Sequence, residues 1–270
     1  MRAIDINCEH LGLLPVQLME NAGAIIAQNI REKMECGKVL FVAGLGNNGG
    51  DAFVAARHLA GFSGYTIKLI LLGKAHDIKT RESCHNFSLL KFSRLQVLEI
   101  KDSSQLTSAV SDWFSEVDLL VDAIFGTGIK KSLKEPESTA VDLINKEGKA
   151  GKIVISVDIP SGVDPDGFYF EKAVHAKLTV TFHRMKIGLI SEKAKGYTGI
   201  IKIADIGICA DAEQYVGPGD LTMLRKRNPE GHKGDSGILV IGGGPYSGAP
   251  ALAALAALRG GCRHCNRSDS

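Results

Sequence analysis

Two aspartates stand where short apolar runs end, and a glycine loop follows each of them. Asp122 lies in VDAIFGTG (121–128), and Asp158 lies in VDIPSG (157–162). In open parallel sheets, ligands bind in the crevice outside the carboxyl ends of the strands. A carboxylate at such a position either caps a helix or belongs to a site, and the two glycine loops favour a site. Ser161, three residues after Asp158, is expected to face the same crevice.

The glycine-rich segment GLGNNGGD (44–51) offers a second set of polar groups. It matches G-x-G-x-x-G between a predicted strand and a predicted helix, which is typical of dinucleotide-binding loops. A dehydrogenase would also need an acidic residue about 20 residues further on, at the end of the next strand. That strand ends in LLGK (71–74), without a carboxylate, which disfavours a dehydrogenase. The amides and the carboxylate instead favour a cradle for a polar ligand or phosphate at a helix N-terminus. The alternative is a plain turn in which Asp51 caps the helix.

The candidate metal ligands near the predicted crevice are all oxygen donors. Asn48, Asp122 and Ser161 supply only oxygen donors, which suit a hard cation rather than a metal bound by thiolates. No C-x-x-C pairs with a second pair of ligands, so the sequence does not support a zinc site. Lys186, after the predicted strand 176–183, is interpreted as a surface lysine, the commoner outcome, or as a group that reaches an anion.

Composition narrows the class of protein. The 270 residues carry 32 Lys and Arg against 30 Asp and Glu, a net charge of +2 that gives no field for non-specific capture of nucleic acid. No apolar run approaches about 18 residues, so no membrane span is predicted. The first residues lack the uninterrupted apolar core of an export signal. Singly scattered cysteines fit reduced thiols in a cytosol. We therefore expect a cytoplasmic protein with neither a nucleic acid nor a membrane as partner.

Strand and helix patterns alternate along most of the chain. Apolar runs predict strands at 38–44, 65–73, 96–100, 118–128, 152–162, 176–183 and 199–208. Helical patterns occur at 11–35, 52–61, 80–92, 103–116 and 137–148. This alternation predicts parallel crossover units, and therefore an α/β fold: a doubly wound three-layer sandwich with a mostly parallel sheet.

The character of the sequence changes near residue 213. We predict a domain over 1–212, a linker over 213–232, and the start of a second α/β domain over 233–270, which is too short to complete one. The polar segment CRHCNRSDS (262–270) stands where an apolar strand is expected. We interpret it as the product of a single-base frameshift, so its two cysteines are not read as a metal site.

Six motifs together resemble the NAD(P)H-hydrate epimerase family, in order and spacing, over residues 1 to about 210. They are QLMENAG (17–23), GLGNNGGDAFVAARHL (44–59), VDAIFGTG (121–128), VDIPSGVDPDG (157–167), TVTFHRMKIGL (179–189) and ADIGI (204–208). The segment 233–261 resembles the start of the ADP-dependent NAD(P)H-hydrate dehydratase domain, which many microbes fuse behind the epimerase. One departure is Ala52, where the family usually has a glycine; we expect it to be tolerated if the backbone there is helical.

The resemblance implies a Rossmann-like fold, a ribokinase-like C-terminal stub, and NADH hydrate or NADPH hydrate as substrate. It places the potassium ligands on Asn48, Asp122 and Ser161, and it implies a possible homodimer. ADP would serve only the incomplete dehydratase domain, whose lyase activity is expected to be absent. The implied substrate contacts are Asn47, Asn48, Gly49, Gly50, Asp51, Gly126, Thr127, Gly128, Ile129, Lys130, Lys131, Ser132 and Asp158.

The implied chemistry is an isomerisation in the repair of nicotinamide cofactors. Loss of the hydroxyl beside the ring nitrogen leaves a cation that the nitrogen lone pair stabilises, and water can return from either face. Catalysis then needs a proton shuttle and a nearby negative charge. Our hypothesis makes Asp158 the acid/base, with Asp122 and potassium fixing the site. The alternative is a non-catalytic ligand- or protein-binding module on the same fold. The presence of Asn48, Asp122, Asp158 and Ser161 favours the enzyme.

Overall fold

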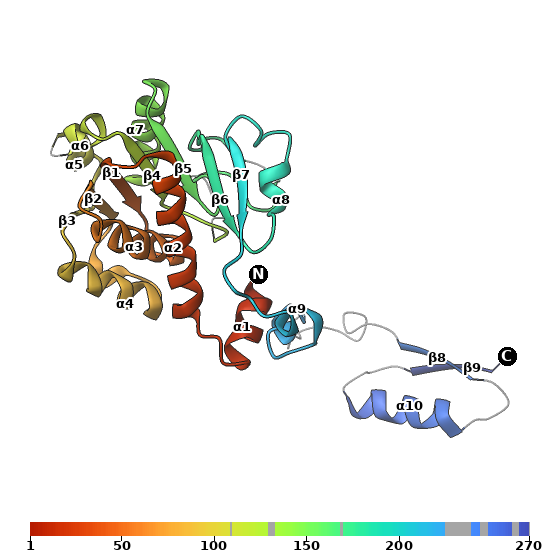
Figure 1. Cartoon of the computed structure of the whole chain (residues 1–270). Helices are drawn as coiled ribbons and strands as arrows, with labels where there is room; N and C mark the ends of the chain where they lie inside the picture. The colour runs from red at the N-terminus through yellow and green to blue at the C-terminus, as the bar shows by residue number, and fades with distance from the viewer. Residues whose placement is uncertain are drawn as a thin grey trace. The chain divides into compact units, whose positions relative to one another are not determined.

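The computed structural model describes residues 1–108, 110–128, 133–167, 170–224, 239–243, 248–260 and 265–269. The chain forms two compact units, Met1–Gly217 and Pro218–Ser270 (Figure 1). No helix among these residues has both the length and the apolar character needed to cross a membrane.

The first unit is built on a seven-stranded sheet in which every neighbouring pair is parallel, in the order β3-β2-β1-β4-β5-β6-β7. The α/β class is confirmed, and the sheet is parallel throughout. Because the chain runs outward from β1 to β3 and then returns to add β4 on the other side, β1 and β4 flank the point where the winding reverses. The strands are β1 (Gly37–Ala43), β2 (Tyr65–Leu72), β3 (Leu95–Ile100), β4 (Leu119–Ala123), β5 (Ile153–Val157), β6 (Leu178–Phe182) and β7 (Ile200–Ala204).

Helices cover both faces of this sheet, as the apolar strands require. Strand β1 shows why: Phe41 packs in one core cluster, whereas its neighbours Leu40 and Val42 pack in another. Helices α2, α3 and α4 contribute to the first cluster, and α5, α6 and α7 to the second. The helices of this unit are α1 (Arg2–His10), α2 (Pro15–Lys33), α3 (Asn47–Ala60), α4 (Arg81–Leu89), α5 (Ser103–Ser108), α6 (Ser111–Glu116), α7 (Glu137–Lys149), α8 (Ile187–Ile190) and α9 (Asp211–Gln214), with short 3-10 turns η1 (Ala75–Asp77) and η2 (Leu90–Phe92).

Helix α3 begins within the segment predicted to be a loop. Gly46 is its N-cap and Asn47 its first residue, so the interpretation of Asp51 as a helix cap is wrong. The early start is possible because Gly44 and Gly49 have no side chains, so that backbone segments can pack directly against each other there. A Cβ on Gly44 would lie 2.0 Å from the carbonyl oxygen of Ile124, and one on Gly49 would lie 2.0 Å from that of Gly44. Ala52 is helical and fully buried, which meets the condition set for its tolerance.

Two further differences from the sequence predictions concern helices. The pattern at 103–116 forms two short helices, α5 and α6, in place of one. Helix α1 was not predicted. The side-chain amide of Asn7 in α1 donates to the carbonyl of Ala212 in α9 at 3.1 Å, a contact between distant segments that local periodicity does not reveal.

The second unit contains the turn η3 (Asp220–Met223), strand β8 (Leu239–Gly243), helix α10 (Gly248–Arg259) and strand β9 (Cys265–Asp269). Strands β8 and β9 pair in parallel. The polar segment 262–270 therefore supplies a strand, at the position where an apolar strand was expected; the frameshift interpretation and the domain limits stay predictions.

Candidate active site

A cavity of about 890 Å³ opens at the carboxyl ends of β1 and β4, where the winding of the sheet reverses. This is the position at which open α/β sheets bind ligands. The glycine-rich segment, the loop after β4 and Asp158 all contribute to its walls. The lining residues are Gly44, Leu45, Gly46, Asn47, Asn48, Asp51, Lys79, Ile124, Phe125, Gly126, Thr127, Gly128, Lys134, Glu135, Glu137 and Asp158.

Asp122 is fully buried at the end of β4 and is not among the lining residues. Its Oδ2 accepts hydrogen bonds from the Ser156 hydroxyl and the Ser161 amide, both at 2.8 Å, and its Oδ1 accepts one from the Ser161 hydroxyl. The Ser161 hydroxyl oxygen also accepts from the Phe125 amide at 3.0 Å. Burial raises the pKa of Asp122, and these hydrogen bonds partly oppose the rise. Asp122 and Ser161 therefore join β4 to the loop after β5.

Asn48 projects from the first turn of α3 and is only 7% exposed. Neither its amide nitrogen nor its amide oxygen has a hydrogen-bond partner. A Cβ added to Gly126 would lie 3.5 Å from Asn48 Cγ and 3.3 Å from Asp158 Oδ2. A side chain at Gly126 would therefore contact both the Asn48 amide and the Asp158 carboxylate. Because an unpaired buried polar group costs roughly 1–3 kcal/mol, Asn48 is suited to bind an ion or a ligand.

Asp158 follows β5 with φ = 64°, in the left-handed region that residues other than glycine seldom adopt. Its backbone amide donates to the carbonyl of Val180 in β6 at 2.7 Å. Its Oδ1 accepts a hydrogen bond from the Thr181 hydroxyl at 3.1 Å and lies 2.5 Å from Lys186 Nζ. With Oδ1 occupied in this way, Oδ2 is the oxygen that lies nearest Gly126 and the cavity.

Lys186 precedes α8 and is only 9% exposed, so its interpretation as a surface lysine is wrong. Its ammonium group donates to the Thr181 hydroxyl at 2.9 Å and to the Phe182 carbonyl at 2.8 Å, besides pairing with Asp158. These three partners use all three N–H donors of a lysine. The anion that Lys186 reaches is therefore the Asp158 carboxylate of the protein itself. This contact depends on β5 lying beside β6, which the sequence alone does not predict.

Asp51, in the second turn of α3, lines both this cavity and a smaller one of about 280 Å³. Burial raises the pKa of Asp51 well above its usual range, and the Asp158 carboxylate adds to the rise. Lys186 acts in the opposite direction. Asp5 of α1 lines the smaller cavity, and burial raises its pKa as well.

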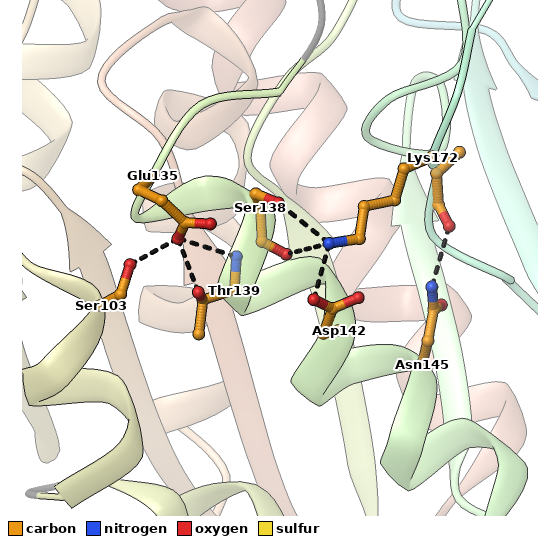
Figure 2. A network of polar contacts seen from close by, with 8 residues as sticks. Ser103, Glu135, Ser138, Thr139, Asp142, Asn145 and Lys172 are labelled. Carbon is orange, nitrogen blue, oxygen red and sulfur yellow. Dashed lines mark hydrogen bonds and ion pairs between the residues drawn. The ribbon is translucent and has the colours of Figure 1, made fainter.

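A polar network fixes the rim of the cavity where the chain enters α7 (Figure 2). The Glu135 carboxylate accepts a hydrogen bond from the Ser103 hydroxyl of α5. It also accepts hydrogen bonds from the Thr139 amide at 3.2 Å and from the Thr139 hydroxyl at 2.6 Å. These bonds lower the pKa of Glu135. On the same helix, Asp142 pairs with Lys172 at 2.6 Å. The rim is thereby tied to α5 and to the segment after β5.

The structure brings together most of the residues predicted to touch substrate. Asn47, Asn48, Asp51, Gly126, Thr127, Gly128 and Asp158 all line the larger cavity. Gly49 and Gly50 do not line it: their absent side chains make room for the Gly44 carbonyl and for Ser83 and Met19, so they serve packing. Ile129, Lys130, Lys131 and Ser132 lie outside the described residues.

Comparison with known proteins places the chain in a family. The profile described as "YjeF-related protein N-terminus" matches residues 15–188. An NAD(P)H-hydrate epimerase of Cenarchaeum symbiosum is 38% identical over 218 residues, which cover 80% of this chain and 96% of the relative. The chain belongs to this family. The family predicted from the six motifs is thereby confirmed, and the profile spans Asn48, Asp122, Asp158 and Lys186.

Longer members of the YjeF-related family are also similar. "Bifunctional NAD(P)H-hydrate repair enzyme Nnr" proteins of Archaeoglobus fulgidus and Methanothermobacter thermautotrophicus are each 44% identical, over 97% of this chain and 52% and 50% of their own length. The chain thus spans about half the length of these relatives. Among solved structures, yeast ynu0 (YNL200c) has a TM-score of 0.55 and 30% identity, covering 63% of this chain and 71% of the yeast chain. The sheet is therefore Rossmann-like, as the family resemblance implied.

Replacing Lys186 with Met should destabilise the protein by at most about 3–5 kcal/mol, because the Asp158 carboxylate, whose side chain is only 13% exposed, then loses its counter-charge. The double variant Lys186→Met/Asp158→Asn should recover much of that loss. The control is Lys202→Met, since Lys202 is an exposed lysine that pairs with Glu32 at 3.0 Å, and its loss should cost less than about 1 kcal/mol. Urea unfolding measures all three variants. Equal losses for Lys186→Met and Lys202→Met would contradict the pairing.

Proposed function

We propose that this chain is an NAD(P)H-hydrate epimerase, an isomerase that interconverts the R and S forms of NADH hydrate or NADPH hydrate in cofactor repair. The observation that carries the proposal is the arrangement across Gly126: an unpaired Asn48 amide on one side and Oδ2 of Asp158 on the other, inside a cavity at the ligand-binding edge of the sheet. Family membership and the name of the Cenarchaeum symbiosum relative support it.

Asp158 is suited to the chemistry of this reaction. Departure of the ring hydroxyl leaves positive charge shared with the ring nitrogen, and a fixed carboxylate beside the ring lowers the energy of that cation. Lys186 and Thr181 hold Oδ1, which fixes the orientation of the carboxylate without occupying Oδ2. Asp158 then exchanges a proton with the hydroxyl or with incoming water through Oδ2, as an acid/base.

Potassium is the metal that the proposal includes, and the unpaired, buried Asn48 amide supports it. Asn48, Asp122 and Ser161 would hold the ion with oxygen atoms alone, and the Asn48 amide oxygen has no other partner. Among the described residues, no group of three or more His, Cys, Asp or Glu side chains gathers in a way that could hold a metal. When bound, the ion would supply a fixed positive charge beside Asn48, which would help to order the substrate contacts.

The proposal assigns the activity to residues 1–212. It treats 213–232 as a linker and 233–270 as the start of a dehydratase domain. ADP is assigned to that domain alone.

Replacing Asp158 with Asn should abolish epimerisation, by roughly 100-fold or more, while leaving the fold intact. The assay mixes R and S hydrates with an independent S-specific dehydratase and its nucleotide, and follows recovery of the reduced cofactor. Wild-type protein should allow the R form to be consumed faster than its spontaneous rate. Asp142→Asn, which alters an ion pair of the rim network, is the matched control and should stay active.

Two outcomes would count against this function. Full activity of Asp158→Asn would remove Asp158 from the mechanism. Persistence of the R form with folded wild-type protein would favour the binding-module alternative, which hydrate-dependent protection in a thermal melt would then identify.

Potassium should raise the melting temperature more than sodium does at equal ionic strength, because an ion that binds only the folded state stabilises it. At about 100 times its dissociation constant, such an ion contributes about 2.7 kcal/mol. Asn48→Ala should abolish the difference between the two salts. Asn145→Ala removes hydrogen bonds between α7 and residues Ala173 and His175, and it should keep the difference. Identical melting in both salts for the wild-type protein would contradict the potassium assignment.

A further inference from the structure

Inversion at the ring carbon requires proton transfer on both faces of the ring, and a single carboxylate on one face does not provide both transfers. The hydroxyl leaves from one face of the ring and water returns from the opposite face. A proton must therefore be delivered on one side and removed on the other. Asp158 lies on one side of the cavity, with its Oδ1 held by Lys186 and Thr181. This inference rests on the proposed function and concerns the group that serves the second face.

Lys186 does not supply the missing proton. Its three donors are used by Asp158, Thr181 and the Phe182 carbonyl, all inside the protein. Releasing a proton would break the pair that fixes the Asp158 carboxylate. With Oδ1 held by the ammonium and Oδ2 lying toward Gly126, the Asp158 carboxylate is placed to stabilise positive charge and to accept a proton. The delivery of a proton falls to another residue of the cavity.

Asp51 is a candidate for this role, because it shares both cavities with Asp158. It projects from the second turn of α3, whereas Asp158 follows β5, and both residues line the larger and the smaller cavity. Among the described residues, nothing donates a hydrogen bond to the Asp51 carboxyl and no cation pairs with it directly. Its side chain keeps part of its surface open to the cavity. A polar group that is enclosed by protein and uncommitted within it is free to bond to a substrate.

We propose that Asp51 is a second catalytic residue, the acid on one face of the ring, with Asp158 as the base on the other. The Asp51 carboxyl gives its proton to the ring hydroxyl, and the carbon–oxygen bond breaks with its electron pair leaving on water. The nitrogen lone pair forms the double bond of the ring cation. Water then adds at the opposite face, those electrons return to nitrogen, and Asp158 takes the proton of the added water. Exchange with solvent restores both groups, and the reverse reaction exchanges their roles.

The charges around Asp51 support this assignment. Burial and the Asp158 carboxylate raise the pKa of Asp51, with Lys186 in opposition. Asp5 on α1 and Glu82 on α4 line the smaller cavity beside it, and Lys79 lines the larger one; the part of α2 that lines the smaller cavity is uncharged. Since the raised pKa keeps Asp51 protonated to higher pH, the rate should fall as pH rises through that pKa.

The test compares Asp51→Asn with Asp5→Asn, which removes another half-buried acid of the smaller cavity. Pure R hydrate is supplied, and the S form is followed by chromatography from about pH 5 to 9, with the spontaneous rate subtracted. Loss of an acid catalyst should lower kcat of Asp51→Asn by at least about 100-fold with KM little changed. Asp5→Asn should stay within about threefold of wild type. The wild-type rate itself should decline with rising pH within this range.

The outcomes separate this inference from the function on which it rests. A folded wild-type protein without activity would overturn the proposed function. An active wild-type protein with Asp51→Asn within about threefold of it would overturn the role of Asp51 alone. If Asp51→Asn does not fold, the wild-type profile decides: a rate that shows no decline with rising pH anywhere from about pH 5 to 9 would overturn the role of Asp51.

Discussion

A lysine ammonium and an aspartate carboxylate share a site with little access to water at the carboxyl ends of β5 and β6. Such a pair is stable only when the remaining hydrogen-bonding groups are also satisfied. Thr181 and the Phe182 carbonyl meet that requirement for Lys186, and Thr181 also donates to Asp158. The backbone at Asp158 is left-handed, and the Asp158 carboxylate lies beside the Lys186 ammonium. One carboxylate oxygen is therefore fixed by the protein, and the other lies toward the cavity.

The rest of the site depends on close backbone packing at the ends of β1 and β4, where the winding of the sheet reverses. Gly44 lets the loop after β4 approach the end of β1, and Gly49 lets α3 start directly beside it. Helix α3 then carries Asn48 and Asp51 to the edge where Asp158 stands. A larger side chain at either glycine would clash with backbone, so the glycine-rich motif serves first to pack the elements and only then to leave room for a ligand.

Much of this could be predicted from the sequence, because buried parallel strands are continuous apolar runs and their ends carry the polar groups. The strands and the placing of Asp158 at a strand end follow from that rule. The grouping of Asp51 and Gly126 with Asn48 and Asp158 was implied by the family resemblance. The burial of Lys186 could not be predicted, since it depends on which strands are neighbours. The start of α3 inside the glycine loop was missed as well, because glycines are typical of turns and the contact that admits a helix there comes from the loop after β4.

The central claim is that this cavity stabilises a ring cation and returns water to its opposite face. The most direct test supplies pure R hydrate to the protein in water enriched in oxygen-18 and measures the label in the S hydrate by mass spectrometry, with the spontaneous exchange subtracted. Because the original hydroxyl leaves and a different water molecule adds, the S product should carry the solvent oxygen. Enzyme-dependent formation of S hydrate that retains the original oxygen would contradict the account.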